Sequence, residues 1–423
     1  MGDYISELPD DVVSYILSFL TLRDAVRARL LSRRWRYLPY CRTVLRLDAL
    51  NVFGNEGYNR VSHRSKFVRL VDQFLDTLRD QTLRVLVLHF GLDNEYSSHI
   101  DSWILRAVTM GIKELDLGIQ NYVFSCYLLC PWMASSLTCL RLSGCQLNLS
   151  SCCTSWISHL TTLHMFGVRM NHNDMVFILS SALNLTSLSL EHCCYPRIKC
   201  LKVELLGLKK LLIDDISLDI KLNCPNLEVF ECIGPLSNLT LAHLPFLRQA
   251  KVFPIGRRDG GSSIIAELIR FAPHLKALSF FVRPLVIQPL PLTARISKSC
   301  LKQLDLVMLV PYGFDLFGIT YFINACPSLE ILRLKLRPLT FTRQSPQKEY
   351  PDCQHQLKEV EIDTYSQKYN LVELVLYLLR NAVALEKMVI ACSDKEKLTT
   401  LLQNVNSSAE LIIQHTQYRK LLQ

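Results

Sequence analysis

The sequence repeats a six-residue pattern that decides its fold. Residues 137–142 read LTCLRL, residues 160–165 read LTTLHM, and residues 185–190 read LTSLSL. In each hexamer, positions one, four and six are apolar. Because alternate side chains of a strand point to the same face, positions four and six predict a short strand that buries one face and exposes the other.

The same pattern recurs along most of the chain. Its first apolar positions are Leu83, Ile112, Leu137, Leu160, Leu185, Leu208, Leu227, Leu247, Leu275, Leu301, Leu329, Leu357 and Leu385. Successive first positions are 19 to 29 residues apart, which matches leucine-rich repeats of about 20 to 29 residues. Several segments between the hexamers have helical periodicity. We therefore expect an α/β solenoid, a leucine-rich-repeat arc with parallel strands inside and helices outside.

The N-terminal segment, residues 6–38, has the periodicity of short helices instead. After Pro9, a good residue for a first helical turn, one apolar stripe contains Val12, Val13, Ile16, Leu17 and Leu20. Two further apolar stripes follow, within residues 22–30 and 31–38. The segment is near the lower limit of about 40 residues for folding unaided, so we expect it to pack against a neighbour.

Four short motifs of this segment resemble the F-box of the plant F-box, leucine-rich-repeat and FBD family. They are Asp3-x-Ile5-Ser6-x-Leu8-Pro9-Asp10, ILSFL at residues 16–20, Ala25-Val26, and LSRRWR at residues 31–36. Thr21 stands where the family usually has proline. The resemblance implies a small all-α F-box of three helices that precedes the repeats.

The C-terminal end is similar to the FBD region of the same family. The similarity lies in LKEVEI at residues 357–362 and in LLRNAVALEKMVI at residues 378–390, without the glycine of the usual Phe-x-Gly turn. We accordingly expect an F-box at 1–48, a leucine-rich-repeat solenoid at 49–345, and FBD-like C-terminal repeats with a cap at 346–423.

The resemblance implies a substrate-recognition subunit of a Skp-cullin-F-box ubiquitin ligase. The F-box would dock on a Skp-type adaptor and, through it, on a cullin-RING ligase. By similarity, the adaptor interface or its immediate support would contain Leu8, Pro9, Ile16, Leu17, Leu20, Val26, Leu31, Ser32 and Trp35. The alternative is that this apolar surface only caps the first repeat.

Residues between the buried strand positions are expected to line the inner face and to bind a protein substrate. Those expected there are Arg141, His164, Glu191, Glu231, Lys251, Arg333, Lys335, Glu359 and Glu361. An ordinary solvated strand face is an equally good interpretation of any single one of them. A repeat scaffold, or a receptor gated by a small molecule, without ligase coupling stays an alternative function.

The positive charge of the chain is concentrated in one segment. The net charge is +9, and residues 23–46 contain eight arginines and one acid, so they contribute +7 and leave +2 for the rest. This distribution argues against a basic groove for nucleic acid along the molecule. The arginine cluster could hold phosphates, but a solvated helix face is the favoured interpretation.

The sequence contains no familiar catalytic or metal-binding motif. Gly-x-Ser-x-Gly, His-Glu-x-x-His and Cys-x-x-Cys are all missing from it, so we expect no catalytic residue, no cofactor and no metal. Residues 1–9 do not resemble a signal peptide, and the sixteen cysteines are therefore expected to be reduced thiols in the cytoplasm and/or nucleus. Polar residues interrupt the charge-free stretch 117–140, so we expect no membrane span.

Overall fold

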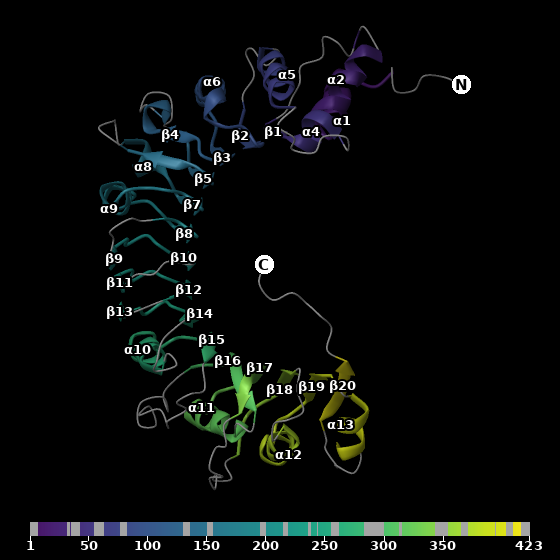
Figure 1. Cartoon of the computed structure of the whole chain (residues 1–423), viewed down its shortest axis with the longest axis vertical. Coiled ribbons are helices and arrows are strands. Elements are labelled where there is room, and N and C mark those ends of the chain that lie inside the picture. Colours follow the sequence, from purple (N-terminus) through teal and green to yellow (C-terminus); the bar gives the residue numbers. More distant parts are fainter. Residues whose placement is uncertain are drawn as a thin grey trace. The chain divides into compact units, whose positions relative to one another are not determined.

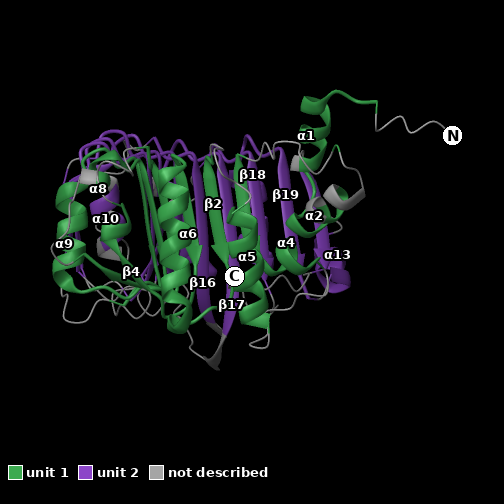
Figure 2. Ribbon diagram, turned by 90° about the horizontal axis from the view of Figure 1, so that it is seen from above, with its two compact units in different colours: residues 1–198 green, residues 199–423 purple. Residues whose placement is uncertain are grey.

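The computed structural model divides the chain into two compact units, residues 1–198 and residues 199–423 (Figure 2). It describes residues 7–31, 34, 43–54, 63–76, 83–129, 136–149, 155–194, 200–214, 219–235, 238–242, 244–254, 262–282, 300–312, 315–342, 354–364, 371–393, 395–402 and 409–415. Each unit contains parallel strands in the order of the sequence, with helices on one face of the sheet (Figure 1).

The first unit begins with two helices and continues into a parallel sheet. The helices are α1 (Asp10–Ser18), α2 (Leu22–Leu31), α4 (Ala49–Phe53), α5 (Arg64–Asp76), α6 (Ser97–Thr109), α8 (Ser155–His159) and α9 (His172–Ser181), with 3₁₀ turns η3 (Asn94–Tyr96) and η4 (Cys126–Leu129). The main sheet contains β1 (Val44–Asp48), β2 (Val85–His89), β3 (Glu114–Gly118), β5 (Cys139–Ser143), β7 (Thr162–Phe166) and β8 (Ser187–Glu191). On the outer side, β4 (Val123–Ser125) pairs with β6 (Gln146–Asn148).

The second unit continues the alternation of inner strands and outer elements. Its main-sheet strands are β10 (Lys210–Asp214), β12 (Val229–Gly234), β14 (Gln249–Pro254), β15 (Ala277–Val282), β16 (Gln303–Tyr312), β17 (Ile331–Thr342), β18 (Glu359–Thr364), β19 (Lys387–Cys392) and β20 (Glu410–His415). The outer elements are β9 (Cys200–Val203), β11 (Asp219–Leu222), β13 (Leu239–Leu241), α10 (Ser262–Phe271), η7 (Leu316–Ile319), α11 (Thr320–Ala325), α12 (Leu371–Asn381) and α13 (Lys395–Leu402).

The repeating hexamer places the main-sheet strands as the sequence predicts. All thirteen first positions are buried, and a strand begins two residues after each of them. Positions four and six are stacked in register, so that Leu115, Leu140 and Leu163 are partners in β3, β5 and β7. The leucine-rich-repeat solenoid is therefore confirmed.

Two main-sheet strands were not predicted, β1 and β20. They have apolar residues at positions four and six, but position one is Arg42 before β1 and Ser408 before β20. Leu45 and Leu47 of β1 are nevertheless fully buried, and β1 pairs in parallel with β2. The predicted F-box boundary at residue 48 thus falls at the end of β1, and the domain boundaries stay predictions.

Three consecutive short repeats have strands instead of helices on the outer side. The hexamers that start at residues 185, 208, 227 and 247 are 23, 19 and 20 residues apart, and the segments between them form β9, β11 and β13. These three strands pair with one another in a small parallel sheet. The repeat of 28 residues from 247 to 275 contains α10, but the repeat of 23 residues from 137 to 160 contains α8, so repeat length alone does not decide the outer element.

Helices α1 and α2 have a small apolar core of their own. Val13 and Leu17 of α1 pack with Ala28 of α2, and Leu8 and Leu20 cover them partly. The third helix expected for an F-box lies outside the described residues, apart from Arg34. The Arg34 guanidinium lies 2.5 Å from the Asp10 carboxylate and also donates to the Leu8 carbonyl.

An arginine joins the helical segment to the first repeat. The Arg23 guanidinium on α2 donates a hydrogen bond to the carbonyl oxygen of Phe53, at the C-terminus of α4. Gly54 follows with φ of +71°, and a Cβ there would lie 2.7 Å from the Arg23 guanidinium nitrogen. Glycine at this position therefore allows both the left-handed backbone and the close approach of Arg23.

We expect the native cysteines to differ sharply in reactivity. Burial raises the pKa of the Cys145 and Cys232 thiols to about 12, whereas Cys194 and Cys300 are exposed. Because the thiolate is the reactive form, iodoacetamide at about pH 8 should label Cys194 and Cys300 in the native protein and label Cys145 and Cys232 only after denaturation. Peptide mass spectrometry measures the labelling, and equal rates for Cys145 and Cys300 would contradict the described packing.

Candidate functional site

Helix α1 exposes an apolar stripe on the side that faces away from its own core. We define the α1 stripe as Val12, Tyr15, Ile16 and Phe19, which share one helix face by their i, i+3, i+4 and i+7 spacing. Tyr15 is 66% exposed and Phe19 is 71% exposed, and their rings make an edge-to-face contact. On the opposite face, Val13 and Leu17 are no more than 2% exposed. Helix α1 is thus apolar on two faces, of which one packs in the core with α2 and the other is exposed.

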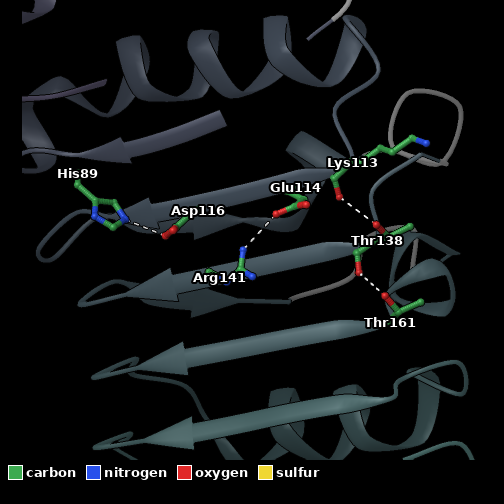
Figure 3. Close-up of polar contacts among 7 residues, drawn as sticks. All are labelled: His89, Lys113, Glu114, Asp116, Thr138, Arg141 and Thr161. Carbon is green, nitrogen blue, oxygen red and sulfur yellow. Dashed lines mark hydrogen bonds and ion pairs between the residues drawn. The ribbon is translucent and has the colours of Figure 1, made fainter. Parts of the chain in front are cut away.

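The inner face of the first unit carries ion pairs between neighbouring strands (Figure 3). His89 Nε2 of β2 lies 2.7 Å from the Asp116 carboxylate of β3, and the Arg141 guanidinium of β5 lies 3.3 Å from the Glu114 carboxylate of β3. Further along the sheet, His164 Nε2 lies 2.7 Å from the Glu191 carboxylate.

The edge at which these strands begin is held by threonine side chains. The Thr161 hydroxyl donates to the Thr138 carbonyl over 3.1 Å, and the Thr138 hydroxyl donates to the Lys113 carbonyl over 3.2 Å (Figure 3). Each hydroxyl therefore bonds the backbone of the preceding repeat. This arrangement holds the strands that carry the charged face in register.

The inner face of the second unit continues the alternation of charges. The Arg333 guanidinium lies between two carboxylates, 3.5 Å from Asp305 and 3.3 Å from Glu361, on the strands to either side of its own. The Arg337 guanidinium lies 3.0 Å from the Asp363 carboxylate. On the neighbouring strands β12 and β14, the Lys251 ammonium lies 3.4 Å from the Glu231 carboxylate.

A three-membered charge cluster lies just before these strands. The Glu330 carboxylate accepts from the Lys302 ammonium over 2.7 Å and from the Lys358 ammonium over 3.0 Å. The two lysines lower the pKa of Glu330, and the bond to Glu330 raises the pKa of Lys358. Exposed pairs of this kind contribute little to stability, so a bound partner could replace them at small cost.

The described residues contain neither a cluster of metal-binding side chains nor a helix suited to span a membrane. Among them, no three His, Cys, Asp or Glu side chains cluster closely enough to hold a metal ion. No helix in the described part of the chain is both long and apolar enough to span a bilayer.

Comparison with known proteins identifies the family. The F-box domain family model matches residues 5–39, which include α1 and its stripe, and the family model described as At1g61320/AtMIF1, LRR domain, matches residues 78–416. The chain belongs to the plant F-box/leucine-rich-repeat family. The second match covers the strands of both units from β2 to β20, in agreement with the leucine-rich-repeat solenoid.

Relatives of this F-box/leucine-rich-repeat protein come from Arabidopsis thaliana. The putative F-box/LRR-repeat protein At3g58880 is 28% identical over 79% of this chain and 78% of its own length. The F-box/FBD/LRR-repeat protein At1g51370 is 25% identical over 91% of this chain and 88% of its own length. A solved internalin from Listeria monocytogenes has a TM-score of 0.33 and 13% identity, over 75% of this chain and 86% of the internalin.

The adaptor positions expected from the sequence fall into three groups. Pro9 and Ile16 lie on the surface of the F-box, Leu8 and Leu20 are half-buried, and Leu17 is buried in the core beneath the α1 stripe. The side chains of Val26 and Leu31, together with Ser32 and Trp35, lie outside the described residues. Tyr15 and Phe19, the most exposed members of the stripe, were not among the expected positions. Their helical spacing from Val12 was the signal that could have indicated them.

The inner-face positions of the F-box/leucine-rich-repeat protein lie where strand alternation puts them. Those with a described ion pair are Arg141, His164, Glu191, Glu231, Lys251, Arg333 and Glu361. Lys335 is half-buried and opposes Asp363 in the register of β17 and β18, and Glu359 is exposed at the start of β18. The structure thus brings these residues onto the strand faces, and their part in binding a substrate stays a prediction.

We expect Asp116→Asn to lower the pKa of His89. The hydrogen bond to Asp116 is the main cause that raises this pKa; burial opposes it, the Asp48 carboxylate adds to it and Arg46 counteracts it. Because the folded-state pKa is raised, the Asp116 contact stabilises the protein fully below the unfolded value of about 6.5 and loses this contribution as pH rises through the folded value.

Histidine NMR titration of selectively labelled protein measures the change in the pKa of His89. Glu114→Gln is the matched control, since Glu114 lies on the same strand and face but pairs with Arg141. An unchanged titration of His89 in Asp116→Asn would show that the pair does not control this residue.

Proposed function

We propose that this chain is the substrate-recognition subunit of a Skp-cullin-F-box ubiquitin ligase, and that it is not itself an enzyme. The observation that carries the proposal is the α1 stripe, an exposed apolar surface within the segment that the F-box family model matches. The stripe would dock on a Skp-type adaptor, and the inner strand faces would bind a protein substrate. We propose a location in the cytoplasm and/or nucleus for this assembly.

The exposed aromatic side chains of the α1 stripe favour binding to a partner. Aromatic side chains such as Tyr15 and Phe19 bury large areas on binding and are enriched among residues that dominate interface energies. Leaving them in water is unfavourable unless a partner covers them. Leu17 would then act as support, because it holds α1 against α2 through the core beneath the stripe.

The inner strand faces have the properties of a selective surface. Charges of both signs alternate across neighbouring strands, as in Asp305, Arg333 and Glu361. A partner with a complementary pattern can exchange these ion pairs for its own, whereas a mismatched partner would bury charges without a counter-ion. The surface would therefore contribute specificity more than affinity.

We expect Ile16→Glu and Phe19→Glu each to weaken adaptor binding by about tenfold to a hundredfold. Each change places a carboxylate where the stripe would be buried against an apolar adaptor surface, while the exposed position spares the core of α1 and α2. Titration calorimetry or surface plasmon resonance with a purified Skp-type adaptor measures the affinity.

Leu183→Glu is the matched control for the stripe variants. Leu183 is an exposed leucine, 68% accessible, that lies outside the F-box between α9 and β8. The Leu183→Glu variant should bind the adaptor with the affinity of the native protein. Full affinity in both stripe variants would refute the assignment of the α1 stripe to adaptor docking.

We expect the double variant Arg333→Glu and Lys335→Glu to capture a different set of proteins while it retains adaptor binding. The two glutamates would lie beside Asp305, Glu361 and Asp363, so the local surface would change from mixed to strongly acidic. Affinity purification followed by quantitative mass spectrometry measures the captured set, with the adaptor as internal reference.

The control for this experiment is Arg380→Glu with Lys395→Glu. Both residues are exposed on outer helices, α12 and α13, and the change in net charge is the same. If the two double variants alter the captured set equally, or if neither does, the inner face around Arg333 is not the substrate surface.

A further inference from the structure

A pocket lies within the first unit, where helix α2 meets helices α4 and α5. It has a volume of about 280 Å³, near the lower end of the range for small-molecule sites. Its apolar lining includes Leu22, Phe53, Val71 and Phe74, all of which are buried. We call it the α2–α5 pocket.

The polar lining of the α2–α5 pocket is basic. Arg23 and Arg27 come from α2, Lys66 from α5, and His63 from the residue just before α5. No aspartate or glutamate is among the described residues that line it. The described acids of these elements have partners of their own: Asp24 of α2 accepts from Thr21, Asp48 at the N-cap of α4 accepts from Asn51, and Asp72 and Asp76 of α5 accept from Trp103 and Arg106. Two members of the arginine cluster at residues 23–46 thus belong to a concave site and not to a uniformly solvated face.

Two contacts orient the cations over the aromatic floor. The Lys66 ammonium lies 5.7 Å from the centroid of the Phe53 ring, and the Arg23 guanidinium is anchored on the Phe53 carbonyl. Phe53 itself belongs to an aromatic cluster with Phe67 and Phe90. Phe53 is thus packed among other aromatic rings, and positive charge lies beside it at the rim of the pocket.

His63 adds a buried polar atom to the same lining. Its Nδ1 has almost no solvent contact, and no described residue forms a hydrogen bond with it. Polar atoms that are buried without a partner are uncommon in native proteins, so His63 adds hydrogen-bonding capacity that the described residues do not use.

We propose that the α2–α5 pocket binds a small organic anion with an aromatic body. The ring would pack on Phe53 and Phe74, and the anionic group would pair with Arg27 and Lys66 at the rim. Inorganic phosphate alone would leave the apolar floor empty, and a neutral apolar molecule would leave the cations unmatched. Because the walls come from α2 and from α4 and α5, the ligand would bridge the F-box to the first repeat. This proposal does not depend on adaptor docking or on substrate binding.

The probe for the test is 4-phenylbutyrate, and the matched neutral probe is 4-phenylbutyramide, which has the same shape without the charge. Isothermal titration calorimetry on the full chain measures both. We expect saturable binding of the carboxylate and about tenfold weaker binding of the amide, since exposed charge pairs each contribute a modest factor.

Variants of the cationic residues test whether 4-phenylbutyrate binds in the α2–α5 pocket. Arg27→Gln with Lys66→Gln should weaken the carboxylate about tenfold and leave the amide unchanged. Arg69→Gln with Lys113→Gln is the control, because both residues are exposed in the first unit, lie outside the lining and change the net charge equally. The proposal is overturned by the absence of saturable binding, by equal affinity for the two probes, or by an equal loss in the control variant.

Discussion

A single repeat of this chain cannot bury its own apolar face. The rest of the structure depends on the contacts between neighbouring repeats that bury it. Positions four and six of each hexamer project from a strand too short to fold back on itself, so they find apolar neighbours only in the repeats before and after. Leu115, Leu140 and Leu163 show the result, since they stack in register on three adjacent strands. Parallel pairing then follows, because every strand is entered from the same side after an outer segment.

Only one face of each main-sheet strand packs in the core. The residues on the other face are therefore not needed for this packing. Arg333 can therefore lie between Asp305 and Glu361, and His89 can pair with Asp116, without any change in the apolar stacking beneath. Such pairs are worth little to stability in water, which makes them suitable for exchange with the charges of a partner. Stability is thus carried by one set of residues on each strand, and the proposed recognition of a substrate by the alternate set.

In the F-box segment, helices instead of strands bury the apolar residues. Helices α1 and α2 bury Val13, Leu17 and Ala28 between them and leave Tyr15 and Phe19 in water. At the other side of α2, Arg23 bonds to Phe53 of the first repeat, and the imperfect fit between the elements leaves the α2–α5 pocket. The segment therefore has two surfaces of different chemistry: the apolar α1 stripe and the basic lining of the α2–α5 pocket.

The sequence alone determined the strands, because the period of two and the spacing of the hexamers are local properties of the chain. It missed β1 and β20, where Arg42 and Ser408 interrupt the pattern, and the outer strands β9, β11 and β13, which stand where helices were expected. Only the tertiary structure decided which face of α1 is buried. Leu17 and Phe19 are both apolar on one helix, and their periodicity cannot say which of them meets α2. The same holds for the α2–α5 pocket, since it forms through packing between α2, α4 and α5, which are separate elements that no local sequence pattern connects.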